Sequence, residues 1–389
     1  MISQSDLVSV IGCDSYAPET VRSALKELLK PFGGLSFVRP GARIVVKANL
    51  VSMMKPESAA TTHPELLKAL CEMLVEKGAS VVVGDSPGGL YNSSYVNLIY
   101  NATGVKAVLE TGAQLNQNFE HKHAQNPCGK VLTELEYTSY LDEADAIINF
   151  CKLKTHGMMG MSACVKNMFG CVPGTFKPEY HYQYPNHADF ADMLVDLSER
   201  FRPALCIVDA VIGMEGNGPT MGTPRKIGCL LASNSPYCCD RVCARIIGLH
   251  PDELETVTAA QKRGLDTEFT LYGDDPSRFY VQDYALVRER KDMSFDHEFK
   301  GLLGKIVGGF LRGALSARPC VKKSDCVGCQ KCFQICPAKA IRMVKNKPAI
   351  DRKRCIRCFC CQEFCPRGAM KVKRSLIAKL INRRGGGHR

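Results

Sequence analysis

Eight cysteines in the last quarter of the chain form two runs with the same spacing, C-x2-C-x2-C-x3-C, and a proline follows each run. A loop of this spacing lets three thiolates hold three irons of a 4Fe-4S cube, while the fourth cysteine lies too far along to close it. We therefore predict two 4Fe-4S clusters with crossed ligand sets, which carry out one-electron transfer. One set is Cys326, Cys329, Cys332 and Cys365, and the other is Cys355, Cys358, Cys361 and Cys336.

A structural zinc site is the alternative, but zinc takes only four sulfurs, usually from two paired knuckles, and two complete quartets argue against it. Residues 320–372 resemble the two-cluster bacterial ferredoxin fold, including the apolar pairs Ala340-Ile341 and Ala369-Met370 that follow each fourth ligand. Cys360 adjoins Cys361, and the spacing selects Cys361 as the ligand. Cys360 is then a spare thiol.

Charge divides the chain of 389 residues into two parts. Residues 299–389 hold 23 Lys+Arg and 3 Asp+Glu, whereas the preceding 298 residues hold 28 and 36, so a basic tail follows a mildly acidic body. The composition, 45% hydrophobic and 23% charged, excludes disorder, collagen and coiled coil. Because no apolar run is long enough for a membrane span and the start lacks a secretory layout, we expect a cytoplasmic protein. Its 21 cysteines then indicate metal ligation or buried thiols instead of disulfides.

The body, residues 1–298, has the pattern of an α/β domain. Short β-branched runs alternate with helical periodicity, which predicts a mostly parallel sheet covered by helices on both faces. Strands are expected at 43–47, 81–83, 146–148, 206–208 and 227–231, and helices at 18–33, 66–77, 187–201 and 240–247. The ferredoxin-like module, residues 320–372, is a separate small α+β domain, and 373–389 is a basic tail.

Residues 299–319 carry apolar side chains at helical spacing with Lys300, Lys305 and Arg312 among them. This pattern predicts an amphipathic basic linker helix. We favour packing of its apolar stripe on the body, because that stripe is needed to attach the module. Attachment to an anionic membrane surface is the alternative.

Polar residues follow four expected strands of the body, and parallel strands bring such residues to one edge of a sheet, where ligands bind. Basic and polar side chains there predict a pocket for an anionic small molecule, formed by Lys47, Asn49, Lys152, Lys154, Lys166, Asp209 and Glu215. His156 and Asp85 are candidate proton donors, and Cys151 is a candidate reactive thiol of low pKa. Taken singly, each of these residues also fits a turn, a cap or a packed side chain.

The motifs of the whole chain resemble those of the domain-of-unknown-function family 362, over about residues 5–372. The motifs are Lys47-Ala48-Asn49-Leu50, Thr62-His63-Pro64, Gly84-Asp85-Ser86-Pro87-Gly88, Lys152-Leu153-Lys154-Thr155-His156, the stretch 165–170 and the stretch 209–219. Similar members carry this domain in front of a two-cluster ferredoxin module. The resemblance implies that architecture and the iron–sulfur assignment, but no reaction. A distant similarity in layout to nickel-pincer lactate racemases brings no catalytic residue across.

Three functional hypotheses follow. The first is a ferredoxin-linked oxidoreductase in which the clusters supply electrons for reduction of an anionic small molecule in the body. The second is a ferredoxin-type carrier whose body is a docking or regulatory module, with the basic tail steering it to an acidic redox partner protein. The third has the tail bind nucleic acid or a membrane, and we rank it last because the tail lacks interleaved aromatic residues.

Overall fold

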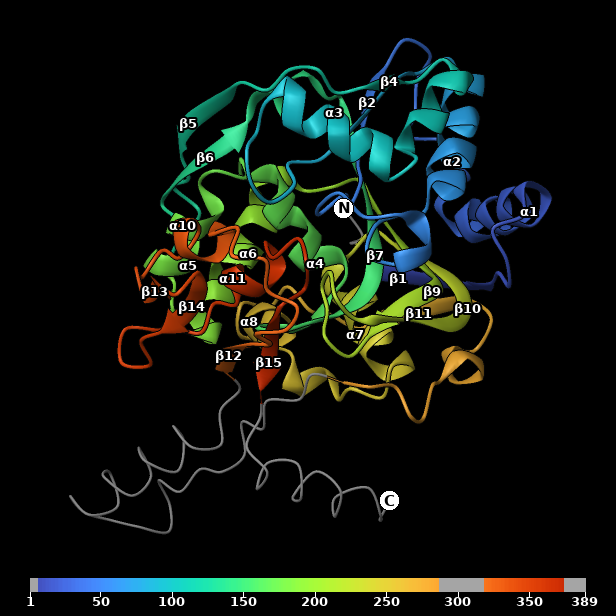
Figure 1. The fold of residues 1–389 in the computed structure, drawn as a ribbon. Helices are drawn as coiled ribbons and strands as arrows, with labels where there is room; N and C mark the ends of the chain where they lie inside the picture. Colours follow the sequence, from blue (N-terminus) through green and yellow to red (C-terminus); the bar gives the residue numbers. More distant parts are fainter. Residues whose placement is uncertain (1–5, 287–317, 374–389) are drawn as a thin grey trace. The chain divides into compact units, whose positions relative to one another are not determined.

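The computed structural model describes residues 6–286 and 318–373, which belong to two compact units, Met1–Val287 and Arg288–Arg389 (Figure 1). The units are described separately below. The helix expected at 299–319 and the tail expected at 373–389 lie outside the described residues, apart from their outermost residues at 318–319 and 373.

The first unit is built on a nine-stranded, mostly parallel sheet, which confirms the predicted fold class. The strand order is β11-β1-β10-β9-β7-β2-β3-β4, and β8 pairs with the end of β7. The strands are β1 (Asp6–Gly12), β2 (Arg43–Lys47), β3 (Ser80–Gly84), β4 (Gln114–Leu115), β7 (Ala146–His156), β8 (Gly160–Ser162), β9 (Leu205–Glu215), β10 (Thr223–Ser233) and β11 (Phe269–Gly273). A separate hairpin pairs β5 (His121–Gln125) with β6 (Glu134–Thr138).

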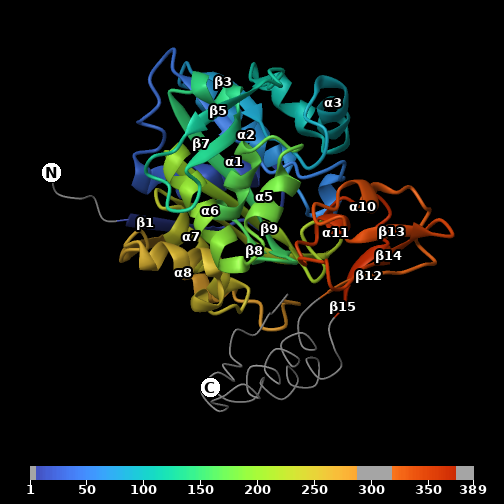
Figure 2. The same ribbon diagram turned by 90° about the vertical axis from the view of Figure 1, so that its left-hand side faces the viewer.

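Helices cover both faces of this sheet (Figures 1 and 2). On β9, Leu205 and Ile207 face one apolar cluster whereas Cys206 and Val208 face another, as the two-residue repeat of a strand requires. The first cluster holds side chains of α1 (Pro18–Leu29), α2 (Pro64–Glu76) and α3 (Ser93–Ala102). The second holds side chains of α4 (Cys164–Asn167), α7 (Pro236–Ile246) and α8 (Glu255–Lys262). The remaining helices of this unit are α5 (Lys177–Gln183) and α6 (His187–Phe201).

Strand direction departs from the expectation at one position. The strand expected at 227–231 is part of β10, which runs antiparallel to both β9 and β1. The neighbours β9, β7, β2, β3 and β4 all run parallel. Because β1 is antiparallel to β10, it points the same way as β9, and its carboxyl end reaches the edge where the polar residues gather.

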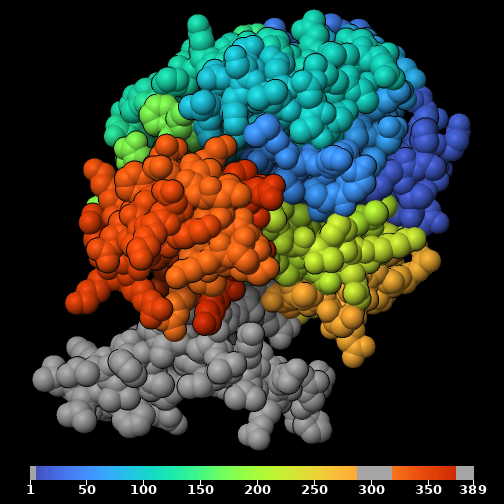
Figure 3. All heavy atoms as spheres, in the orientation of Figure 1, coloured from blue at the N-terminus to red at the C-terminus, as the bar shows by residue number. Residues whose placement is uncertain are grey.

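The second unit contains a small domain with an internal repeat (orange to red in Figure 3). Strand β12 (Arg318–Val321) pairs with β15 (Met370–Lys373), and β13 (Ile341–Val344) pairs with β14 (Lys347–Ile350). The short helices are α10 (Lys331–Gln334) and α11 (Cys360–Glu363). From β12 to β14, from α10 to α11 and from β13 to β15 the starting residue advances by the same 29 positions. This repeat is the ferredoxin-like α+β fold predicted from the cysteine runs.

Asp196 of α6 ties three segments of the body together. Its buried carboxylate accepts hydrogen bonds from the backbone N–H groups of residues 130, 131 and 132, each at 2.9 Å, and from Arg263 Nη2 at 2.7 Å. We expect Asp196→Ala to destabilise the body by about 3 kcal/mol, because it leaves a guanidinium and three donors without their acceptor. Urea denaturation of the full chain, followed by circular dichroism, measures the change.

The matched control is Glu268→Ala, which removes an exposed carboxylate. It should change the free energy of unfolding by less than about 0.5 kcal/mol. Equal effects of the two substitutions would contradict the role given to Asp196.

Candidate functional sites

The carboxyl ends of β2 and β3 bring Lys47 and Asp85 together in the interior. Lys47 Nζ lies 2.7 Å from Asp85 Oδ1 and also donates to the carbonyl of Ala48 at 2.8 Å. The other carboxylate oxygen, Oδ2, accepts from the backbone N–H of Leu50 at 2.8 Å. Lys47 is fully buried, so the ion pair and these hydrogen bonds replace the water that its ammonium loses.

Asn167 connects this ion pair to the segment that follows β2 and to β7. Its Oδ1 accepts from Asn49 Nδ2 at 2.7 Å and from Lys47 Nζ at 3.2 Å, and its Nδ2 donates to Asn149 Oδ1 at 2.7 Å. The turn after α4 passes so close that a Cβ atom at Gly170 would overlap both Asp85 and Lys47. Glycine at 170 therefore permits the buried pair to form.

A second buried pair joins β7 to β9. Lys152 Nζ lies 2.8 Å from Asp209 Oδ2 and donates to the hydroxyl of Tyr16 at 2.8 Å, and that hydroxyl donates to Asp209 Oδ1 at 2.9 Å. Burial lowers the pKa of Lys152, an effect that the carboxylate of Asp209 opposes. Burial and Asp209 together raise the pKa of Tyr16, so the phenol is neutral and acts as a donor.

His63 lies against this second pair and is partly exposed. Its ring stacks on that of Tyr16 with centroids 3.5 Å apart and an interplanar angle of 5°, and its backbone N–H donates to Asp209 Oδ2 at 3.0 Å. Its Nδ1 caps α2 by accepting from the N–H of Glu65. Burial lowers the pKa of His63 to about 4, so the ring is neutral at pH 7.

Lys154 and His156 follow at the end of β7. Lys154 Nζ donates to Asn49 Oδ1 at 2.7 Å and to the carbonyl of Ala60 at 2.5 Å. His156 Nδ1 accepts from the N–H groups of Met158 and Met159, both at 3.2 Å, which fixes the ring within the turn between β7 and β8. The structure therefore collects Lys47, Asn49, Asp85, Lys152, Lys154 and Asp209 into one buried region at the sheet edge, as the parallel strands predicted.

Two of the charged residues expected at this site have other surroundings. Lys166 Nζ is half-buried and lies 4.7 Å from the ring centroid of Phe169. Glu215 accepts from the N–H of Ala285 at 3.0 Å, away from the lysines.

Cys151 corrects the expectation of a reactive thiol. It is completely buried on the opposite face of β7, where it donates to the carbonyl of Ile207 at 3.5 Å. Burial raises its pKa to about 11, so it is not the thiol of low pKa that its neighbouring lysines suggested.

Four residues of this region are additional to those named from the sequence as site residues: Tyr16, His63, Asn149 and Asn167. Asn167 and His63 belong to motifs quoted above, and Asn149 directly follows an expected strand. No such signal marked Tyr16, because β1 itself was not expected.

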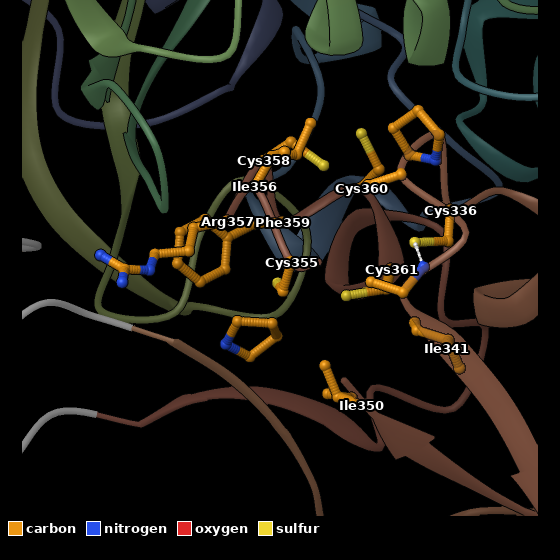
Figure 4. Close-up of a pocket in the computed structure, with 14 residues that line it drawn as sticks. Cys336, Ile341, Ile350, Cys355, Ile356, Arg357, Cys358, Phe359, Cys360 and Cys361 are labelled. Carbon is orange, nitrogen blue, oxygen red and sulfur yellow. Dashed lines mark hydrogen bonds between the residues drawn. The ribbon is translucent and has the colours of Figure 1, made fainter. Parts of the chain in front are cut away.

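The small domain contains two hollows, each lined by four of the eight cysteines. The first hollow, about 350 Å³ of space free of protein atoms, is lined by Cys326, Cys329, Cys332 and Cys365. The second hollow, about 330 Å³, is lined by Cys336, Cys355, Cys358 and Cys361 (Figure 4). Each set thus takes three cysteines from one run and the fourth from the other.

The arrangement of these sulfurs fits a cluster better than a single ion. Within residues 6–286 and 318–373, no three His, Cys, Asp or Glu side chains converge closely enough to hold one metal ion. Zinc bonded to four thiolates needs every sulfur about 2.3 Å from one point. Sulfurs placed around a hollow instead fit a cube of iron and sulfide. One backbone N–H also donates to a sulfur at each hollow, from Ala369 to Cys365 and from Ala340 to Cys336, both at 3.2 Å.

Comparisons with known proteins agree with this architecture. Residues 44–245 match the family described as domain of unknown function DUF362. The chain belongs to this family. Residues 318–366 match the 4Fe-4S dicluster domain, so the small domain is a ferredoxin-type module that binds 4Fe-4S clusters.

A relative of this chain is the thylakoid-associated protein sll1697 of Synechocystis sp., 32% identical over 293 residues, which cover 72% of this chain and 87% of that protein. Among solved structures, lactate racemase apoprotein from Thermoanaerobacterium thermosaccharolyticum matches with 12% identity and a TM-score of 0.37, over 61% of this chain and 57% of the racemase. A structural-genomics protein from Thermotoga maritima matches with 13% identity and a TM-score of 0.36, over 55% of each chain. This chain therefore spans little more than half the length of the two solved structures. In the described part of the chain, no helix has the length and apolar character to cross a membrane.

The buried state of His63 has a consequence for stability. Its pKa falls from an ordinary 6.5 to about 4 on folding, so between these values the unfolded chain binds the proton that the folded chain does not. The stabilising contribution of the neutral ring is complete above about pH 6.5 and is lost as the pH falls towards 4. We expect His63→Asn, which retains a capping acceptor, to destabilise the protein less at pH 5 than at pH 7.5, measured by urea denaturation.

His250 offers a matched control because its Nδ1 also caps a short helix, by accepting from the N–H of Asp252 at 3.4 Å, while its side chain is 68% exposed. The destabilisation caused by His250→Asn should not be smaller at pH 5 than at pH 7.5. If His63→Asn lowers the free energy of unfolding equally at both pH values, the ring is not held neutral in the folded protein.

Proposed function

We propose that this protein is an electron-transfer protein whose module holds two 4Fe-4S clusters. The observation that supports this most directly is the pair of hollows, each bordered by the four cysteines that the crossed ligand assignment requires. Cys326, Cys329, Cys332 and Cys365 would hold one cluster, and Cys336, Cys355, Cys358 and Cys361 the other. When bound, such clusters accept and release single electrons.

The residues of the module have three tasks in this function. The thiolates supply the ligands, the N–H groups of Ala340 and Ala369 stabilise negative charge on two of the sulfurs, and the apolar side chains around them exclude water. Basic side chains surround this core. Residues 318–373 contain 15 Lys+Arg and 3 Asp+Glu. This excess supports an acidic protein as the redox partner, since opposite charges accelerate encounter.

For the body, we propose that electrons from the module reduce an anionic small molecule at the buried polar edge. Lys47, Lys152 and Lys154 provide three ammonium groups there, each already held by oxygen atoms within 3.2 Å. Asp85 and Asp209 fix two of these lysines in position. His63 is neutral and partly exposed, and its Nδ1 accepts the N–H of Glu65, so its Nε2–H is better placed than the buried His156 to donate a hydrogen bond to a ligand entering from solvent.

The basic module also favours a second candidate, a carrier whose body does no chemistry. Reduction of an acidic partner protein by the carrier would slow steeply as ionic strength rises, because salt screens the attraction. The two candidates differ in what reoxidises the protein. The oxidoreductase, reduced anaerobically with dithionite, is reoxidised by a small anion from a metabolite extract, whereas the carrier is reoxidised only by a protein.

The cluster assignment predicts the outcome of two ligand substitutions. Protein purified without oxygen should contain about eight irons, the content of two cubes. Cys329→Ser and Cys358→Ser should each lower this to about four and should loosen the module, because cluster binding and folding are coupled. Iron analysis, visible absorbance and proteolysis of the module provide the measurements. Cys128→Ser, at an exposed cysteine outside both runs, is the control. Full iron content in either ligand variant would refute the assignment.

The role of the body predicts a different pattern for Lys154→Ala. We expect unchanged iron content and absorbance but at least a tenfold loss of reoxidation by the active metabolite, because the change removes an ammonium group from the proposed anion site. Lys262→Ala, at an exposed position on α8, serves as the control. Loss of iron on Lys154→Ala would contradict the assignment of Lys154 to the anion site. Unchanged reoxidation by the metabolite would favour the carrier.

A further inference from the structure

The repeat within the module permits a comparison of the two hollows position by position. Most residues that line one hollow have a counterpart 29 positions away in the sequence that lines the other hollow. These counterparts include the four cysteines of each hollow and the prolines Pro348 and Pro319. The backbone is equivalent as well, since Gln330 and Phe359, which precede α10 and α11, both adopt the left-handed conformation with φ of 62° and 59°. Each hollow also has one equivalent backbone N–H contact at 3.2 Å, from Ala369 to Cys365 Sγ at the first and from Ala340 to Cys336 Sγ at the second.

The side chains at equivalent positions are not matched. The first hollow has Gln330, Lys331 and Arg367 where the second has Phe359, Cys360 and Ala338. At these three positions, two cations and an amide are replaced by an aromatic ring, a thiol and a methyl group.

At one position the cation is at the second hollow instead, because Arg357 there corresponds to Gly328 of the first hollow. Figure 4 shows that the side chain of Arg357 extends away from the sulfurs, although its charge still acts on Cys355. The rest of that lining is largely apolar and includes Ile341, Ile350 and Ile356.

Two further contacts bear on the charge near the first hollow. The ammonium of Lys347 donates to the backbone carbonyl of Cys326, which places a third cation beside a cysteine of this hollow. The adjacent carboxylate, Asp325, is paired with Lys322 Nζ at 3.0 Å and does not line the hollow. Arg354 precedes Cys355 at the second hollow, but its side chain is exposed and does not line that hollow either.

We propose, on the basis of the proposed function, that the cluster of the first hollow has the higher reduction potential. A reduced cluster carries one more negative charge, which nearby cations and polar groups stabilise and an apolar lining does not. The left-handed backbone and the N–H contacts of Ala369 and Ala340 are alike in the two hollows, so we assign the difference in potential to the lining side chains. The singly reduced protein therefore holds its electron at the first hollow, next to Lys331 and Arg367.

An anaerobic reductive titration of the full chain tests this order. Dithionite supplies one electron in each of two steps, which visible absorbance and electron paramagnetic resonance follow. Lys331→Ala with Arg367→Ala should lower the potential of the first step towards that of the second and leave the second in place. Lys323→Ala with Arg352→Ala, two exposed cations that line neither hollow, is the control of equal charge and should move the first step less.

A reciprocal variant examines the second hollow. Phe359→Gln places there the residue found at Gln330 and should raise the potential of the second step alone. Iron content of each variant shows whether both clusters have formed. About four irons or fewer in the parent protein would refute the proposed function. Full iron with two steps of equal potential, or with both steps shifted alike by the Lys331 and Arg367 substitutions, would overturn this inference while leaving the proposed function intact.

Discussion

Four thiolates that share one iron–sulfur cube must surround a space instead of meeting at a point, and the fold of the module follows from this requirement. Two pairs of short antiparallel strands and two single-turn helices, with elements repeated after 29 residues, place the cysteines around two hollows. The left-handed residues before α10 and α11 turn the chain between the second and third cysteines of each run. A domain this small has few side chains to bury, so cluster ligation has to supply much of its stability.

The body meets a different constraint, because it buries lysine side chains at the edge of a sheet. An ammonium group removed from water is costly unless oxygen atoms replace its hydration. Asp85 and Asp209 provide carboxylates for Lys47 and Lys152, while Asn49 provides an amide oxygen for Lys154. Gly170 allows the backbone to pass close to the first pair. Such groups are fixed in position before any ligand arrives, which is the condition for electrostatic stabilisation of a bound anion.

The features that could be predicted from the sequence are those encoded locally. Cysteine spacing predicted which four thiols line each hollow, and polar residues after parallel strands predicted that Lys47, Asp85 and Asp209 would lie at the same edge of the sheet. Strand direction is not encoded in an apolar run, so the reversed β10 and the contribution of Tyr16 could not be deduced. The surroundings of Cys151 follow from the two-residue repeat of a strand. On β7, Lys152 and Lys154 share a face with Phe150, and alternation directs Cys151 to the opposite face.

The repeat also separates what the module must keep from what it can vary. The cysteine spacing, the left-handed residues and the N–H contacts of Ala340 and Ala369 are the same in both halves, as the proposal of one 4Fe-4S cluster in each hollow requires. The positions between the cysteines carry no such demand, and there lysine and glutamine in one half correspond to cysteine and phenylalanine in the other. Charge around a cluster can therefore change without altering its ligation. Under the proposed function, that independence allows the two half-sites to hold electrons of different energy, which gives transfer between them a direction.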